Sequence, residues 1–341
     1  MKVVYSLQLA IMMWAAVCPC AAADDGVKIG GAVLGFVFDG DAKALRAILG
    51  VPGSSLLSSP LSLNRPINRA VTASQRDYGI AVTPETDLVQ ITNLSGTASI
   101  QPLASGVLPD DSIRLSPSGV VAAIYRKASG RIQVFTGLPD GPVLAREADV
   151  STLPGSLTAL AVSDDGAAVL AGFSGTDSGS VQLVDSAGNV SPLLSVARAS
   201  SMAFLSGSRS ALIADSGSNK IYLVRDVTGL AQATAILIDS DGVANPVAVE
   251  SSGDNRLTLV ANSQSGTVLI LDQASGAPVS VPCFCVPSGL TRLSGNAVFR
   301  LTELSSGPLW LIDADAPEPR ILFVPPRNEA PQNANPPAGA H

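Results

Sequence analysis

The sequence predicts an all-β fold built from repeated four-stranded units, and three observations lead to this prediction. One phrase recurs six times: an apolar strand, a small polar turn and a second apolar strand, as in "LAVSDDGAAVLAG" from Leu160 to Gly172. Helical periodicity is nearly absent. The serines that align in the phrase lie 42 to 47 residues apart, at Ser74, Ser116, Ser163, Ser206, Ser251 and Ser294. Units of four short strands at this period are typical of the blades of a β-propeller.

The second half of each unit carries two further apolar stretches. The third stretch ends near an Asp or Asn and reads LVQITN, IQVFTG, VQLVDS, IYLVRD, VLILDQ and LWLIDA in the six units. The fourth reads SIQPLAS, VLAREAD, SPLLSVA, TAILID, PVSVP and RILFVP. Each stretch is short, rich in Val, Ile and Leu, and bounded by Gly, Ser, Asp or Pro, which favour turns. The chain therefore contains six complete units.

A partial unit precedes these six. In the segment 32–53, "LGFVFDG" matches the third-strand phrase and "ALRAILG" the fourth. The sequence predicts a propeller of seven blades with an abbreviated N-terminal one. The alternative is a ring of six blades with an added hairpin. We expect the ring to close by pairing N-terminal and C-terminal strands, because closure leaves no long open sheet edge.

Both ends of the chain differ from the repeats. Residues 1–23 combine Lys2, an apolar run and a small-residue site at Ala21–Ala23, which is the layout of a secretory signal peptide. A lipid on Cys18 or Cys20 is an alternative, although neither is preceded by a lipobox. The propeller is expected over residues 24–326. Residues 327–341 are rich in Pro, Asn and Ala, so a disordered C-terminal tail is predicted.

These features indicate a secreted or periplasmic protein. The net charge is −7, and removal of Lys2 with the signal peptide makes it one unit more negative. No cluster of Lys and Arg is present, which argues against a nucleic-acid partner. No later stretch is long and apolar enough to span a bilayer, so we expect no integral membrane segment after cleavage.

Two units carry a family resemblance. "LTLVANSQSGTVLILDQASG" (Leu257–Gly276) resembles the repeat of exported bacterial YVTN-type propellers, and "ALIADSGSNKIYLVRD" (Ala211–Asp226) is similar to the NHL-type repeat. The Trp-Asp and Gly-His marks of WD40 repeats are absent. The resemblance implies a β-propeller. It implies no particular activity, because such folds carry unrelated functions.

The histidine content decides most enzyme hypotheses. The only histidine is His341, in the expected tail, so the folded region holds no histidine-based catalytic triad or metal site. We therefore expect a non-catalytic binding or scaffolding module for a protein or small-molecule ligand, with no organic cofactor. The alternative is a calcium-type, metal-dependent lactonase or hydrolase, which needs only converging Glu, Asn and Asp.

One segment has the start of a calcium loop. "DSDGVAN" runs from Asp239 to Asn245 and begins with the Asp-x-Asp-Gly pattern. It lacks the distal bidentate Glu of an EF-hand. If calcium binds, the candidate ligands are Asp239, Asp241 and Asn245. The alternative is a plain turn, because Asp and Gly are common turn residues.

Two cysteines remain after signal cleavage, Cys283 and Cys285 in "VPCFCVPSG". In an extended strand their Cβ atoms would lie roughly 6.5–7 Å apart, whereas a disulfide needs about 3.5–4.5 Å. The flanking Pro282 and Pro287 permit a bend. The pair is therefore either two reduced, partly buried thiols or a local disulfide. A metal or redox function is a third alternative.

Three arginines are predicted contacts on the rim of the propeller. The loops that link each fourth strand to the next first strand share one face, and loops on a rigid scaffold commonly bind ligands. These loops are small, weakly charged and poor in aromatic residues. Their predicted rim contacts are Arg114, Arg198 and Arg292.

Overall fold

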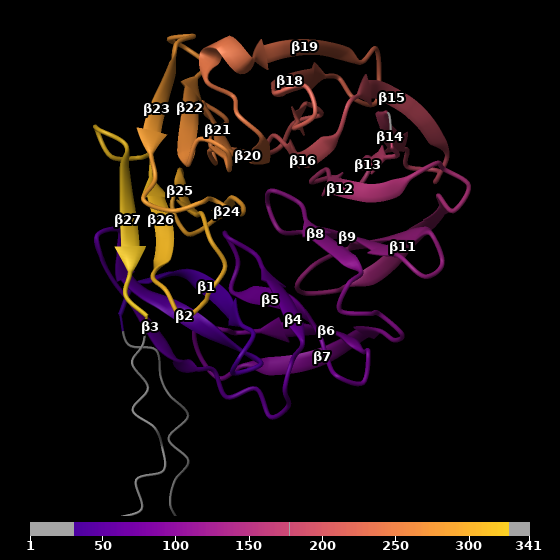
Figure 1. The fold of residues 1–341 in the computed structure, drawn as a ribbon. Helices are drawn as coiled ribbons and strands as arrows, with labels where there is room; N and C mark the ends of the chain where they lie inside the picture. The colour runs from indigo at the N-terminus through magenta and orange to yellow at the C-terminus, as the bar shows by residue number, and fades with distance from the viewer. Residues whose placement is uncertain (1–30, 177, 327–341) are drawn as a thin grey trace, which may run out of the picture.

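Seven antiparallel β-sheets surround a central channel in the computed structural model of the protein (Figure 1). The structure describes residues 31–176 and 178–326. The prediction of seven blades with an abbreviated N-terminal one is confirmed, and the alternative of six blades with a hairpin is wrong. The predicted signal peptide (1–23) and C-terminal tail (327–341) lie outside the described residues.

The blades, numbered in chain order, are contiguous in sequence. Blade 1 contains β1 (Val33–Asp39), β2 (Ala44–Val51) and β3 (Ser54–Pro60). Blade 2 contains β4 (Arg69–Thr72), β5 (Tyr78–Val82), β6 (Leu88–Thr92) and β7 (Ser99–Ala104). Blade 3 contains β8 (Ser112–Leu115), β9 (Val121–Arg126), β10 (Arg131–Thr136) and β11 (Val143–Asp149). Blade 4 contains β12 (Ser156–Val162), β13 (Val169–Ser174), β14 (Gly179–Val184) and β15 (Val190–Val196).

The last three blades follow the same plan. Blade 5 contains β16 (Ala199–Phe204), β17 (Ala211–Asp215), β18 (Lys220–Arg225) and β19 (Gln232–Leu237). A single 3₁₀ turn, η1 (Asp239–Asp241), follows it. Blade 6 contains β20 (Pro246–Ser251), β21 (Leu257–Asn262), β22 (Thr267–Asp272) and β23 (Pro278–Pro282). Blade 7 contains β24 (Thr291–Arg292), β25 (Val298–Arg300), β26 (Leu309–Asp313) and β27 (Arg320–Val324).

The hydrophobic core lies between the blades. One apolar cluster fills each junction between neighbouring blades, including the junction of blades 1 and 7, so the described residues form a complete ring. The second strand of each complete blade packs on both faces, and every residue of β5, β17 and β21 is buried. Between blades 4 and 5, Phe204 is 2% exposed, and burying a side chain of this size contributes about 2–3 kcal/mol.

The N-terminal blade has three described strands, one more than the expected pair. The segment after β2, "SSLLSSP", forms the extra strand β3. The chain direction also differs from the expectation. β1 begins beside Leu293, at the turn end of β24, and its turn to β2 lies beside Leu304 at the opposite end. In direction, β1 to β3 therefore correspond to the second to fourth strands of a complete blade, whereas the sequence match had assigned β1 and β2 as the third and fourth.

The ring closes without a shared sheet, so the predicted pairing of terminal strands is wrong for the described residues. Blades 1 and 7 are separate sheets joined by the apolar cluster that includes Val37, Leu293 and Val324. The Ser294 N–H donates to the Leu34 carbonyl (2.6 Å). Gly35 permits this close approach, because a Cβ there would lie 2.9 Å from Leu293 Cδ2. The described residues contain no helix long and apolar enough to cross a bilayer.

Candidate functional site

The central channel contains a cavity of about 490 Å³, which lies among the inner strands of the ring. The first strand of each complete blade contributes to its wall, and blade 1 contributes β1 through Phe36, Val37 and Phe38. The wall is uncharged along β1, β12 and β16, and its charged residues come from blades 2, 3, 6 and 7. The charged residues that line it are Arg69, Arg114, Glu250, Arg292, Arg300 and Glu303.

Hydrogen bonds between turns span one end of the channel. The turn between the first and second strands of each complete blade lies at this end, and each is bonded to the next around the ring. Asp164 is the most connected member: it accepts from the Ser118 N–H (2.7 Å) and hydroxyl (2.6 Å) and from the Gly207 N–H (2.8 Å). The contacts join Arg76 to Ser118, Ser118 to Asp164, Asp164 to Gly207, Ser206 to Asn255, Asp254 to Asn296, and Gly295 to Gln75.

Arg292 adds a bond across the channel at the same end. Its Nη2 donates to the Pro117 carbonyl at 2.7 Å, and its Nε donates to the Ser74 hydroxyl at 3.4 Å. These partners belong to blades 3 and 2, whereas Arg292 belongs to blade 7. The turn end is therefore narrowed by a guanidinium as well as by the hydrogen-bonded turns.

The opposite end carries three charged residues. Arg300 donates to both oxygens of the Glu303 carboxylate at 2.7 and 2.9 Å, so this pair neutralises itself. Arg69 donates to the carbonyls of Pro109 (3.1 Å) and Asp111 (2.5 Å). Carbonyl acceptors orient the Arg69 guanidinium, and the Glu303, Asp111 and Asp110 carboxylates act on its charge without forming an ion pair with it. This end has no set of bonds that spans the channel among the described residues.

Arg114 and Glu250 face the middle of the cavity. They occupy the same register position on β8 and β20. Each lies two residues before a serine, Ser116 or Ser252, whose N–H donates to the start of the second strand and closes the turn. Arg114 forms no hydrogen bond or ion pair with another described residue. Burial raises the pKa of the Glu250 carboxyl to about 7, although Arg292 and Arg114 act in the opposite direction. The middle of the channel thus holds a cation with no hydrogen-bond partner among the described residues, beside a carboxyl whose pKa is raised to about 7.

Comparisons with known proteins support the fold. No known protein family and no curated protein matches the sequence. The chain is similar to the structure of a functionally unknown protein from Desulfotomaculum acetoxidans (TM-score 0.58, 13% identity, covering 87% of this chain and 100% of the other). It is also similar to streptogramin B lyase (0.54, 13%, 76% and 85%) and to a chain of the nidogen/laminin complex (0.50, 12%, 76% and 95%). At these identities, the similarity shows the β-propeller fold alone.

The three predicted rim arginines do not share one location. Arg114 and Arg292 lie on inner strands and line the cavity, so they are brought together inside the ring. Arg198 lies in the loop between β15 and β16, and its side chain is exposed outside the cavity. Its backbone N–H donates to Asp215 at 2.8 Å. Of the three arginines, only Arg198 therefore lies on the rim, outside the cavity.

Sequence reasoning missed four lining residues: Arg69, Glu250, Arg300 and Glu303. For Glu250 a signal was present. "AVESS" places one charge inside an otherwise apolar first strand, at the register position of Arg114 in "SIRLS". A charge in such a strand indicates a residue that faces the channel. Arg300 and Glu303 reach the cavity from the second strand of blade 7 and the loop after it, and the repeat pattern contained no sign of this.

The candidate calcium ligands have separate partners in the structure. The Asp241 carboxylate accepts the Ile238 N–H (2.9 Å) at the start of η1. Asp239 accepts a weak hydrogen bond from Asn219 (3.3 Å), and the Asn245 amide donates to Ser263 (2.8 Å). Among the described residues, no group of three or more His, Cys, Asp or Glu is placed to hold a metal ion. These contacts are those of a surface turn.

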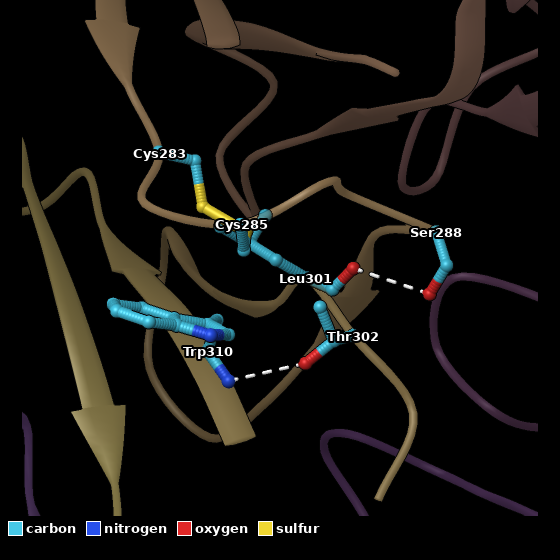
Figure 2. Close-up of a disulfide and its surroundings, with 6 residues drawn as sticks. All are labelled: Cys283, Cys285, Ser288, Leu301, Thr302 and Trp310. Atoms are coloured by element: carbon cyan, nitrogen blue, oxygen red, sulfur yellow. Dashed lines mark hydrogen bonds between the residues drawn. A yellow bond between two sulfur atoms is a disulfide. The ribbon is translucent and has the colours of Figure 1, made fainter. Parts of the chain in front are cut away.

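Cys283 and Cys285 form a disulfide in the connector between blades 6 and 7 (Figure 2). Their Cα atoms are 5.0 Å apart, nearer than the ~6.6 Å of an extended strand, so the connector bends there. Both cysteines pack against the apolar cluster between the two blades, which includes Trp310. The Cys283 N–H donates to Gly266 of blade 6, and the Ser288 N–H donates to Leu301 of blade 7. The connector therefore joins the two blades, and its end at Ser288–Leu290 lines the cavity whereas the two cysteines do not.

Proposed function

We propose that this protein is an exported, non-catalytic binding propeller of the YVTN/NHL type that takes a ligand into its central channel. The observation that carries the proposal is the cavity of about 490 Å³, which hydrogen bonds span at one end. In its middle lies Arg114, which has no hydrogen-bond partner among the described residues. Small-molecule sites commonly have volumes of about 300–1,000 Å³ and a few convergent polar groups. The ligand enters from the end that carries Arg69 and Glu303.

The composition of the cavity wall favours binding over catalysis. Its lining includes no histidine, cysteine or aspartate. It contains two carboxyl groups, Glu250 and Glu303, and Glu303 is paired with Arg300. A calcium-type lactonase requires several carboxylate and amide oxygens that converge on one ion. Arginine guanidinium groups instead bind carboxylate and phosphate groups through a rigid fork of N–H donors. The proposed ligand is a small molecule or a segment of a protein partner that fits the channel.

A screen with a matched blocked variant tests channel binding. A chemically diverse fragment library with anionic, cationic and neutral members is screened by thermal shift against the wild type, Ala161→Phe and Ala203→Phe. Both alanines line the cavity, on β12 and β16. We expect some fragments to stabilise the wild type and neither blocked variant. A screen in which no fragment binds, or in which every fragment binds all three proteins equally, contradicts the proposal.

Export has its own test. If residues 1–23 are a signal peptide, the protein recovered from the envelope or the culture medium begins at Asp24. Intact-mass measurement of the protein expressed in a bacterial host distinguishes this species from the full-length chain. Recovery of the full-length chain from the cytoplasm alone would exclude export.

A further inference from the structure

The charge of the cavity wall differs in sign from that of the whole chain. The chain has a net charge of −7, yet the cavity is lined by four arginines and two glutamates. The lining therefore carries a net positive charge even when both carboxyl groups are ionised. Clefts lined by one sign of charge, with walls of low dielectric, concentrate ligands of the opposite sign.

Of the four lining guanidinium groups, only Arg300 forms an ion pair with a carboxylate among the described residues. Carboxylates still act on the others without forming an ion pair: Glu303, Asp111 and Asp110 on Arg69, and Glu250 on Arg114 and Arg292. Arg69 donates to carbonyl oxygens at one end of the cavity, and Arg292 donates to a carbonyl and a hydroxyl at the other. These neutral partners fix the direction of each side chain. Arg114, between them, has no hydrogen-bond partner among the described residues. Arg69 and Arg292 are therefore oriented cations, and the N–H donors of Arg114 have no partner among the described residues. A guanidinium with free N–H donors binds carboxylate and phosphate oxygens.

Glu250 is the lining carboxyl that acts on Arg114 and Arg292. The groups that interact with it are Arg114 on β8 and Arg292 on β24. The strands on its other side, β16 and β12, contribute only uncharged side chains to the lining, all of them apolar except Ser201. Its carboxyl has no hydrogen bond or ion pair within the described residues apart from its interaction with the backbone. Its charge therefore acts directly on whatever occupies the cavity beside Arg114.

We infer that the channel binds a small anion, with a carboxylate or phosphate group on Arg114 between Arg69 and Arg292, and that protonation of Glu250 tightens this binding. The inference rests on the proposed channel-binding function and names the ligand class. The cavity volume limits the ligand to a metabolite-sized anion, because a polyanion such as nucleic acid does not fit into about 490 Å³.

The direction of the pH effect follows from charge. Burial raises the pKa of Glu250 to about 7, so the carboxyl is mostly neutral below pH 7 and mostly charged above it. A charged Glu250 repels an anion on Arg114, whereas a neutral one does not. Anion affinity therefore falls as pH rises through about 7. Glu250→Gln keeps the shape and removes the charge, so it binds anions tightly at every pH.

The test uses calorimetric titration of the full-length protein with sulfate and succinate. Each titration is made at about pH 6.5 and at about pH 8.5, on either side of the Glu250 pKa, and sulfate carries the same charge at both. Choline and glucose serve as the cationic and the neutral control probe. We expect sulfate to bind about fivefold more tightly at the lower pH, and Glu250→Gln to remove that difference. Arg114→Gln weakens binding about tenfold or more. Arg198→Gln, on the rim outside the cavity, leaves it unchanged.

Each outcome has a distinct meaning. If choline or glucose binds while sulfate and succinate do not, the anion inference is wrong and channel binding stands. If no probe and no library fragment binds, the proposed function fails as well. If wild type and Arg114→Gln bind the anion equally tightly, Arg114 is not the binding site. If the pH dependence is unchanged in Glu250→Gln, Glu250 does not control the affinity. If Arg114→Gln does not fold, crystals soaked in iodide replace it, and anomalous density away from Arg114 overturns the site.

Discussion

Arg292 and Pro117 are bonded across the channel although 175 residues separate them in sequence. The Arg292 Nη2 donates to the Pro117 carbonyl at 2.7 Å, which ties the inner strand of blade 7 to the first turn of blade 3. Neighbouring blades in the ring are joined mainly by apolar packing. This hydrogen bond instead joins blades 7 and 3, which are not neighbours. It fixes the width of the turn end of the channel.

Removing that bond should destabilise the ring. Arg292→Met retains much of the aliphatic stem and leaves the Pro117 carbonyl without its donor. We expect a loss of about 1–3 kcal/mol, because the variant removes a hydrogen bond from a charged donor and leaves a partly buried acceptor unsatisfied. Urea denaturation measures it. Arg198→Met, which removes an exposed arginine, is the control and should cost less than about 0.5 kcal/mol. Equal effects of the two variants would contradict a structural role for the bond.

Tyr78 makes a second bond between blades. Its side chain is fully buried, and its hydroxyl donates to the Gly119 carbonyl in the first turn of blade 3 (2.6 Å). Burial raises the pKa of the phenol, so it stays protonated and acts as a donor at physiological pH. Tyr78→Phe should lower stability by about 1–2 kcal/mol through the unsatisfied carbonyl. Tyr222→Phe, whose hydroxyl donates to no described residue, is the matched control in the same denaturation experiment.

Asp164 should make stability depend on acid pH. Burial would raise its pKa, but hydrogen bonds from Ser118 and Gly207 outweigh burial and lower it below the ordinary 3.8. Because the folded-state pKa is the lower one, the stabilisation is present above the unfolded-state pKa. It is lost as pH falls through the folded-state value.

Asp164→Asn removes this contribution at neutral pH. We expect a loss of roughly 1.5–3 kcal/mol, the range for hydrogen bonds to a charged group. The difference between wild type and variant should shrink when melting is measured at about pH 3 instead of pH 7. Asp110→Asn, at an exposed carboxylate that forms an ion pair with the exposed Lys127, serves as the control. A gap between Asp164→Asn and wild type that stays constant over this pH range contradicts the linkage.

A buried ion pair holds the abbreviated blade together. Arg46 of β2 contacts the Asp39 carboxylate at the end of β1 and donates to the Ser58 carbonyl of β3 (3.0 Å), so one side chain bridges all three strands. Both partners are nearly buried. Asp39→Ala removes the buried carboxylate that contacts Arg46 and should cost about 3–5 kcal/mol, whereas replacing both residues by apolar ones should cost less. A double variant Asp39→Ala/Arg46→Met that is no more stable than Asp39→Ala contradicts this.

The sequence predicted the blades well because their determinants are local. Each complete blade repeats an apolar strand and a turn of small polar residues, and β12 to β15 follow the predicted phrases closely. Blade 1 was harder. "SSLLSSP" is rich in serine and resembles a linker, yet it pairs with β2 because Leu57 packs into the cluster between blades 1 and 7. This pairing depends on tertiary contacts that no short phrase shows.

The site was less predictable than the fold. The sequence predicts Arg114 and Arg292 as contacts on the rim, whereas both line the cavity, because the sequence does not show how far a first strand reaches into the channel. Glu303 lies in an irregular loop after β25 and meets the cavity only once the ring is assembled. Residues that converge from different blades become neighbours through closure of the ring, and the order of residues within one unit holds no information about that closure.

The disulfide should contribute little to global stability, because it closes a very short loop. Cross-linking cysteines separated by one residue restricts the unfolded chain only slightly, by about 1.5 kcal/mol at 25 °C. The double variant Cys283→Ala/Cys285→Ala keeps apolar contact with the Trp310 cluster, so we expect a loss no larger than this in urea denaturation. Thiol labelling of the wild type should find reactive cysteines at these positions only after reduction. A loss above about 3 kcal/mol would show that the disulfide, and not apolar packing, holds blade 6 to blade 7.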